Sequence, residues 1–184
     1  MTRYIALLRA INVGGHSVKM EALRQLFVDL GLSNVETFIN SGNVIFETRA
    51  TKTGSLEKKI EGQLEKALGY KVAAFIRSTA ELAAIAEYQP FPGAGSGEAA
   101  ETLYIAFTQA PPSPQAVQKL MAAQTERDRF QVHERQVYWL LRTRFSDSPF
   151  SGSGQFEKML GVPATVRNST TVRKLAAKYP APSG

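Results

Sequence analysis

Short apolar runs alternate with apolar positions at helical spacing in the first part of the chain. The run over residues 3–10 is short and glycines follow it, which predicts a strand. Apolar residues then recur every three or four positions from Met20 to Leu30, which predicts a helix, and Gly31 is placed to end that helix in the left-handed conformation. Two alternating segments follow, and Ser41-Gly42 between them predicts two strands joined by a tight two-residue hairpin.

Helical and then strand-like patterning follows the hairpin. Leu56, Ile60, Leu64 and Leu68 form one apolar stripe, which predicts a second helix. The segment "KVAAFIR" from Lys71 predicts another strand, and "STAELAAIAEY" after it predicts a further helix. The first half of the chain therefore has the predicted order βαββαβ, followed by one helix.

The same order of elements recurs after a segment rich in proline, glycine and alanine. "QPFPGAGSGEAAE" predicts a linker or an exposed loop. Beyond it the pattern predicts a strand, a helix that begins at Ser113-Pro114, two strands, a helix, a short strand and a final helix. The two halves share this order of elements with little evident sequence identity.

A repeated βαββαβ order is typical of the ferredoxin-like plait, a four-stranded antiparallel sheet with two helices on one face. We therefore predict an α+β fold of two tandem ferredoxin-like α/β-plait units with an additional C-terminal helix. The first unit and its linking helix take residues 1–90, the linker takes residues 91–101, and the second unit with the C-terminal helix takes residues 102–184.

A polar, glycine-bearing loop joins the first predicted strand to the first predicted helix. It carries Arg9, Asn12, Gly14 and Gly15. The loop leads to a helix N-terminus, where unpaired N–H groups and the helix dipole favour an anion. Glycines let a ligand approach the backbone, and the arginine and asparagine can donate hydrogen bonds to it. The alternative is a plain turn with Arg9 in an ion pair.

A second junction of this kind lies in "ATVRNSTTVRKL". Arg167 and Asn168 come just before a helix that Ser169 or Thr170 can cap. An anion held there would meet backbone N–H groups and a guanidinium together. The alternative is that the polar residues only cap the helix.

The excess positive charge lies in the last third of the chain. Residues 1–126 hold equal numbers of basic and acidic side chains, so the whole net charge of +6 belongs to residues 127–184. A surface of one sign favours an anionic partner such as a nucleotide or nucleic acid, although a solvated basic face is the alternative.

Several classes of chemistry are excluded by composition. The chain has no cysteine, which excludes disulfides, thiolate nucleophiles and cysteine-based metal sites and suits a reducing compartment. His16 and His133 are far apart in the sequence, and neither a Walker A loop nor a serine-hydrolase motif occurs. We expect a cytoplasmic protein with no metal, no cofactor and no membrane partner, since no apolar stretch approaches the length of a membrane span.

Four segments together resemble the bacterial domain of unknown function 1697 family. They are "LLRAINVGG", "MEALRQLFVDLG", "TFINSGNVIF" and "LGVPATVRNSTTVRKL", and the similarity extends from about Tyr4 to Leu175. The resemblance implies a tandem α/β-plait fold and no settled activity. The residues that recur in the family correspond to Arg9, Asn12, Gly14, Gly15, Ser41, Gly42, Asn43, Thr165, Arg167 and Asn168. Relatives commonly have tryptophan after the Arg-Asn pair, and Ser169 in its place argues against aromatic stacking there.

These observations predict a protein that binds a phosphate-bearing ligand, either a nucleotide or RNA, at its loop-to-helix junctions. Arg9, Asn12, Arg167 and Asn168 are the main predicted contacts, with the Ser41-Gly42-Asn43 turn and Thr170 beside them. One alternative is a metal-independent enzyme in which Arg9 and Arg167 stabilise a developing anion. The other is a structural or partner-binding module. No residue pattern identifies a catalytic acid or base.

Overall fold

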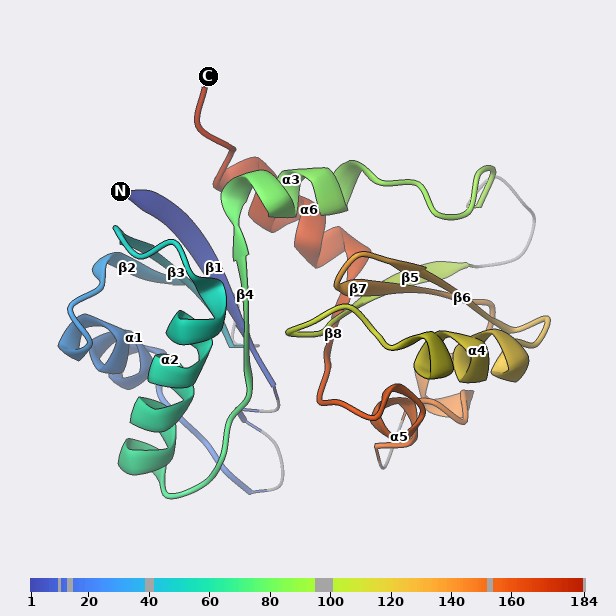
Figure 1. The fold of residues 1–184 in the computed structure, drawn as a ribbon, viewed down its shortest axis with the longest axis horizontal. Coiled ribbons are helices and arrows are strands. Elements are labelled where there is room, and N and C mark those ends of the chain that lie inside the picture. Colours follow the sequence, from blue (N-terminus) through green and yellow to red (C-terminus); the bar gives the residue numbers. More distant parts are fainter. Residues whose placement is uncertain (10, 13–14, 39–41, 95–100, 152–153, 184) are drawn as a thin grey trace. The chain divides into compact units, whose positions relative to one another are not determined.

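The computed structural model describes residues 1–9, 11–12, 15–38, 42–94, 101–151 and 154–183. Within these residues the protein has a mixed α+β fold with two four-stranded antiparallel sheets and six α-helices (Figure 1). The chain divides into two compact units. The first comprises residues 1–85 and 174–184, and the second comprises residues 86–173. Part of the predicted linker, residues 95–100, lies outside the described residues, and the domain boundaries expected from the sequence stay predictions.

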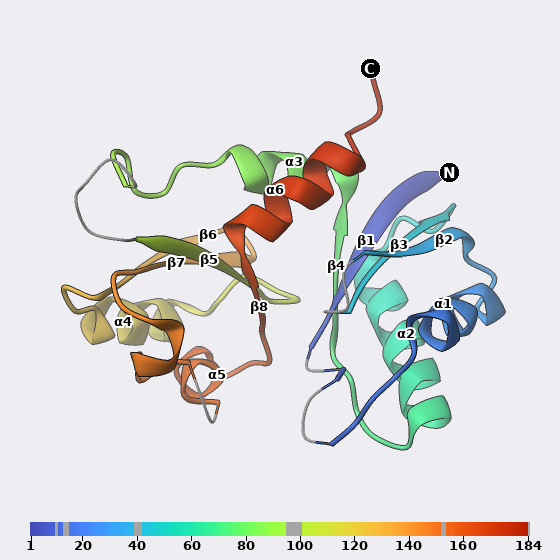
Figure 2. The same cartoon turned by 180° about the vertical axis from the view of Figure 1, so that it is seen from behind.

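The first unit has the predicted order βαββαβ. Its elements are β1 (Thr2–Leu8), α1 (Met20–Asp29), β2 (Ser33–Phe38), β3 (Asn43–Thr48), α2 (Thr53–Leu68) and β4 (Ala74–Ser78). The strands lie in the order β2-β3-β1-β4, and each neighbouring pair is antiparallel. Both α1 and α2 lie against the same face of this sheet, as Figure 2 shows from behind.

The core of the first unit lies between this sheet face and the two helices. Side chains alternate along a strand, so Tyr4 and Leu8 of β1 point to the helices. Phe27 of α1 and Ile60 of α2 meet them from the other side and are fully buried. Each such side chain contributes roughly 1.5–3 kcal/mol to the free energy of folding by leaving water. Packing of the amphipathic faces therefore fixes the helices on the sheet.

Two glycines set turns in the first unit. Gly31 follows α1 with φ +80°, which confirms the predicted left-handed end of that helix. The turn predicted at Ser41-Gly42 lies partly outside the described residues. The observed register pairs Phe38 with Asn43, whereas a two-residue turn at Ser41-Gly42 would pair Phe38 with Ile45. Gly42 has φ +75°, and its carbonyl accepts a hydrogen bond from the N–H of Leu8 at 2.8 Å. This contact to β1 fixes the register of the hairpin from outside it.

The second unit repeats the order of elements. After α3 (Thr79–Glu87) come β5 (Thr102–Phe107), α4 (Pro114–Ala123), β6 (Asp128–His133), β7 (Gln136–Leu141), a 3-10 turn η1 (Phe145–Asp147), α5 (Gln155–Leu160), β8 (Thr165–Asn168) and α6 (Ser169–Lys178). The strands lie in the order β6-β7-β5-β8, again antiparallel. Ser113 caps α4 by accepting a hydrogen bond from the N–H of Ala116 at 3.2 Å, as the sequence predicts.

Trp139 stands at the centre of the second core. Its ring packs against those of Phe130 and Phe156. Its Nε1–H donates to Oδ1 of Asp128 at 2.9 Å, and the Ser148 hydroxyl donates to the same oxygen at 2.7 Å. Asp128 is buried, so these donors supply the hydrogen bonds that a buried carboxylate requires.

The strand register shows which positions of the two units correspond. In the first unit Ile5 pairs with Arg77, and in the second Ile105 pairs with Arg167. This alignment superposes "YIA" at the start of β1 on "YIA" in β5. In both units the last strand runs directly into a helix, α3 after β4 and α6 after β8. Arg77, which the sequence analysis does not single out, is therefore the counterpart of Arg167.

Candidate functional site

The predicted site residues fall into two groups, one in each unit. Arg9, Asn12, Gly15, Gly42 and Asn43 belong to the first unit, and Arg167, Asn168 and Thr170 belong to the second. Gly14 and Ser41 lie outside the described residues. A composite site that joins Arg9 to Arg167 stays a prediction.

In the first group, contacts within the described part of the loop after β1, and from this part to Tyr70, stabilise it. The Oδ1 atom of Asn12 accepts a hydrogen bond from the N–H of Val18 at 2.8 Å. The hydroxyl of Tyr70 donates to the carbonyl of Ile11 at 3.1 Å, and the ring of His16 stacks on Tyr70 with centroids 3.8 Å apart. These contacts give Asn12 a structural role beside any contact with a ligand.

The hairpin residues of the first group lie against this loop. A Cβ atom added to Gly42 would come within 2.9 Å of Cγ2 of Ile11 and 3.2 Å of Cβ of Leu8. Asn43 is buried, and its Nδ2 donates to the carbonyl of Phe38 at 3.0 Å. The close approach at Gly42 and the hydrogen bond of Asn43 therefore give both residues a structural role. Arg9 is exposed, and its backbone N–H donates to the carbonyl of Ala73 at 3.0 Å.

In the second group, Arg167 is a buried cation. Its side chain donates from Nη1 to Oγ1 of Thr165 at 2.7 Å and to the carbonyl of Val166 at 3.1 Å. Burial lowers the pKa of Arg167 to about 10, so the guanidinium stays charged at neutral pH. The charge lies in the last strand, directly before the junction with α6.

The junction between β8 and α6 borders a cavity of about 460 Å³. Asn168 caps the helix, because its Oδ1 accepts a hydrogen bond from the N–H of Thr170 at 2.9 Å. Asn168, Ser169 and Thr170 line the cavity together with residues 88–91, 93 and 94, which follow α3. The volume is within the range of small-molecule sites in proteins. All the lining residues belong to the second unit.

Arg173 completes this cavity and is absent from the residues predicted from the sequence. It lies four positions after Ser169, which puts both on one side of α6, and it lines the cavity. Its side chain is exposed and makes no hydrogen bond or ion pair with any residue that the structure describes. The helical spacing from the junction was the signal that could have found it.

Aromatic and acidic side chains also line the cavity. Phe91 lines the cavity, and the guanidinium of Arg129 lies 5.6 Å from its ring centroid. Tyr88 also lines it and stacks on His133 with centroids 4.1 Å apart. Glu101 accepts a hydrogen bond from Nε of Arg142 at 2.7 Å, so its carboxylate is already paired with a cation.

The corresponding junction of the first unit is closed by a carboxylate. There Ser78 Oγ accepts from the N–H of Glu81 at 3.1 Å, and Glu81 Oε2 accepts from the N–H of Ser78 at 2.8 Å. This reciprocal pair is a capping box. By the strand register, Thr171 takes the place of Glu81 in the second unit, and Arg173 takes the place of Ala83. The second junction thus lacks the acidic group and gains a basic one.

The described residues carry neither a cluster suited to a metal ion nor a helix suited to a membrane span. No three histidine, aspartate or glutamate side chains among them are grouped so that they could hold a metal ion. No helix in the described part of the chain has the length and apolar character needed to cross a membrane.

Comparison with known proteins places the chain in a family. Residues 1–138 match the family described as "Protein of unknown function (DUF1697)". The chain belongs to the DUF1697 family. The match contains the loop after β1 and the hairpin of the first unit, and the β8–α6 junction lies beyond it. Membership confirms the resemblance drawn from the sequence segments.

A solved structure shares the architecture of this DUF1697 protein. It is described as the structure of conserved bacterial protein SP0830 from Streptococcus pneumoniae, and it is 26% identical in sequence. The alignment has a TM-score of 0.75 and covers 98% of this chain and 99% of that chain. No curated protein matches the chain.

Proposed function

We propose that this DUF1697 protein binds a phosphate-bearing small molecule of nucleotide size in the second unit, beside the first turn of α6. The observation that carries the proposal is the cavity of about 460 Å³ lined by Asn168, Thr170 and Arg173. Arg173 has no ion-pair partner among the described residues, so its charge is available to a ligand. We interpret each unit as a ferredoxin-like plait, with the junction after its last strand as the ligand-binding end.

The chemistry of this junction suits a phosphate group. The first turn of a helix carries N–H groups without intrahelical partners, and the helix dipole adds positive potential there. A guanidinium binds two phosphate oxygens at once through its planar fork of donors. Arg173 therefore supplies the strong charged contact, and the hydroxyl of Thr170 supplies a further donor.

The remaining wall suits the organic part of such a ligand. Phe91, Leu103 and Leu140 provide aromatic and apolar surface in the same cavity as Arg173. A planar base packs favourably on an aromatic ring, at about 1–3 kcal/mol per stacked base in known complexes. Most of the exposed lining is polar, so the apolar contact is confined to a small part of the wall.

The internal duplication supports the choice of the second unit. In the first unit the carboxylate of Glu81 occupies the helix start that a phosphate would need. Like charges repel, so an anion is disfavoured at that junction. In the second unit Thr171 removes the negative charge and Arg173 adds a positive one. The ligand contacts expected of Arg9 and Asn12 in the first unit stay predictions.

The direct test is calorimetric titration of the protein with mononucleotides and with inorganic triphosphate. Saturating ligand stabilises the fold by about 2.7 kcal/mol at a hundredfold excess over the dissociation constant, so thermal shift gives a parallel readout. We expect Arg173→Gln to weaken binding about tenfold or more, because it removes a charged hydrogen bond. The matched control is Lys174→Gln, which removes one positive charge from an exposed neighbouring position on α6.

Two outcomes would contradict the proposal. One is the absence of saturable binding by any nucleotide or polyphosphate. The other is an equal loss of affinity in the Arg173 and Lys174 variants, which would mean that binding depends only on the net charge of the protein.

A metal-independent enzyme is the second candidate function. The observation in its favour is that Glu101 and Arg173 line the same cavity, so a titratable carboxylate and an arginine flank one bound molecule. Incubation of the protein with each bound nucleotide, followed by phosphorus NMR, tests this candidate. New phosphorus resonances would show turnover, and unchanged spectra with saturable binding would leave a binding protein.

A further inference from the structure

A second cavity lies in the first unit and combines an apolar floor with a basic rim. Its volume is about 430 Å³, and it lies between the end of α1, the connection from β3 to α2, and the first turns of α2. Leu30, Leu32 and Leu56 form the apolar part. Among the described residues, the charged ones that line it are Arg49, Lys52 and Lys59, and none of its described lining residues is acidic.

The floor is part of the folded core and is therefore preformed. Leu32 and Leu56 are buried members of the core cluster, and Leu30 packs against it. The Nζ of Lys59 donates to the carbonyl of Leu30 at 2.9 Å, which ties the end of α1 to α2 across the cavity. A ligand would find this surface without rearrangement of the backbone.

The basic rim is not neutralised by the protein's own carboxylates. Glu47, just before this connection, accepts hydrogen bonds from Arg3 and from Asn34, and these bonds lower its pKa. Glu57, just after it, accepts from the N–H of Ile76 at 3.0 Å.

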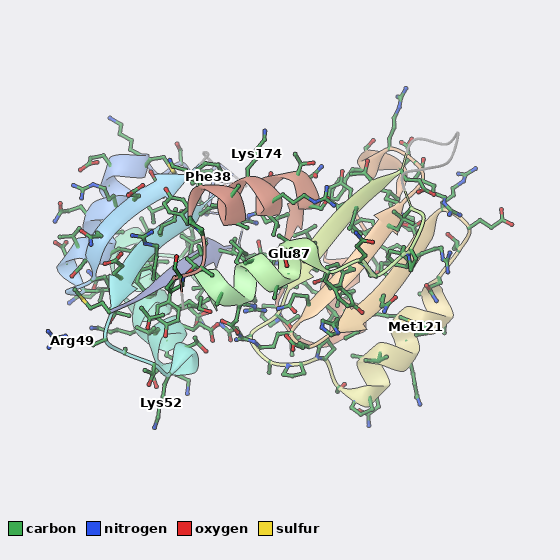
Figure 3. The ribbon with its side chains drawn as sticks, turned by 90° about the horizontal axis from the view of Figure 1, so that it is seen from above. Phe38, Arg49, Lys52, Glu87, Met121 and Lys174 are labelled. Atoms are coloured by element: carbon green, nitrogen blue, oxygen red, sulfur yellow. The ribbon has the colours of Figure 1, made fainter. Side chains whose placement is uncertain are left out.

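Both of these carboxylates are thus committed elsewhere. The side chains of Arg49 and Lys52 are exposed and make no hydrogen bond or ion pair with any described residue, and Figure 3 shows both side chains projecting from the edge of the unit.

We infer that this cavity binds an amphiphilic organic anion, a small molecule with an apolar body and one anionic head group. The leucine floor favours burial of an alkyl or aryl group, at roughly 25 cal/mol per Å² of apolar surface removed from water. The side chains of Arg49 and Lys52 lie at the rim without a described partner. They supply the contacts to a phosphate or carboxylate head group. The site lies in the other unit from the proposed nucleotide site and does not depend on it.

Titration of the isotope-labelled full chain with hexyl phosphate and with hexanoate, followed by NMR, tests this inference. Hexanol and inorganic phosphate serve as the two half-ligands. We expect saturable shifts at the amides of Leu56 and Lys59 with an amphiphilic anion, and much weaker ones with either half-ligand. The ratio of affinities for the two anions identifies the preferred head group.

Variants separate the basic rim from general surface charge. The double substitution Arg49→Gln with Lys52→Gln is expected to weaken binding of the preferred anion about tenfold or more. Lys58→Gln on the exposed side of α2 is the matched control and should leave affinity unchanged, as should Arg173→Gln in the second unit.

The inference is overturned if neither anion binds saturably or if hexanol binds as tightly as both. It is also overturned if Lys58→Gln costs as much affinity as the double variant. Retained binding in Arg173→Gln separates this site from the proposed nucleotide site, so each can fail without the other.

Discussion

Single residues of the loop after β1 combine structural and potential ligand roles. Asn12 is the clearest case, because its Oδ1 accepts the N–H of Val18 at 2.8 Å. Asn12→Ala removes that acceptor and is expected to lower the free energy of unfolding by about 0.5–1.5 kcal/mol. Asn12→Asp keeps an acceptor oxygen and should cost less. Urea denaturation of both variants measures this, and a stability of Asn12→Ala equal to that of the parent would show that the hydrogen bond contributes nothing.

Two glycines with similar backbone conformation differ in the space around them. Gly15 has φ +84° with nothing within 4 Å of an added Cβ, whereas at Gly42, with φ +75°, such an atom would lie 2.9 Å from Ile11. Gly15→Ala is therefore expected to cost about 1–2 kcal/mol, the price of the left-handed conformation alone. Gly42→Ala adds a clash and should cost roughly 1–3 kcal/mol more. Equal losses in chemical denaturation would mean that Ile11 moves aside freely.

At the scale of elements, the two strand-to-helix junctions give a matched comparison. Thr171→Glu introduces a carboxylate at the junction of the second unit, at the position that corresponds to Glu81 in the first unit. We expect the stability of the protein to stay equal or to rise by about 0.5–1 kcal/mol, since acidic groups favour a helix N-terminus. Nucleotide binding should fall at least tenfold, because the carboxylate repels phosphate and occupies the same N–H groups.

The neutral variant Thr171→Gln separates charge from occupancy. It has similar reach without the negative charge, so it should weaken nucleotide binding less than Thr171→Glu does. Calorimetric titration of both variants, with thermal denaturation in parallel, gives the two readouts. Unchanged affinity in Thr171→Glu would exclude the start of α6 from the binding site.

The end of α6 is attached to β2 by a buried tyrosine. The Tyr179 hydroxyl donates to Oε2 of Glu36 at 2.7 Å. Burial, and then the bond to Glu36, raise the pKa of Tyr179 above its ordinary value of 10.0. An unfolded tyrosine ionises first as the pH rises, so this contribution to stability is complete below about pH 10 and declines at higher pH. Tyr179→Phe should remove this part of the alkaline decline.

Denaturation midpoints of the parent and Tyr179→Phe, followed from pH 8 to pH 11, measure that effect. The variant should be less stable at pH 8, because the Glu36 carboxylate loses a donor, and the gap should narrow as the pH rises. A constant gap across this range would show that the hydroxyl titrates in the folded protein as it does in the unfolded chain.

The elements themselves could be predicted because their signals are local. Apolar periodicity gave the repeated βαββαβ order, Gly31 marked the end of α1, and Ser113 marked the start of α4. The hairpin register could not be predicted in this way, since the contact of Gly42 with Leu8 joins two separate strands. Local sequence suggests a turn at Ser41-Gly42, and the observed register instead pairs Phe38 with Asn43.

At the scale of the whole molecule, the residue-by-residue correspondence between the two units becomes visible only through the strand register. Arg77 and Arg167 correspond because each pairs with the isoleucine of a "YIA" segment. The cavity beside α6 also depends on residues that are far apart in the sequence. Residues in segment 88–94 and Arg173 come together only in the folded unit. The local sequence points to the Arg167-Asn168 junction, whereas Arg173, which gives the cavity its unpaired charge, is not among the predicted residues.

The central claim is that a phosphate-bearing molecule binds beside the first turn of α6. Chemical-shift mapping of the isotope-labelled protein with a saturating mononucleotide tests it most directly, because the backbone amides of Ser169 and Thr170 report contact at the junction itself. We expect these amides and the Arg173 side chain to give the largest saturable shifts, and Arg173→Gln to move the amide shifts to about tenfold higher ligand concentration or more. Saturable binding with no shift in residues 168–173 would contradict it.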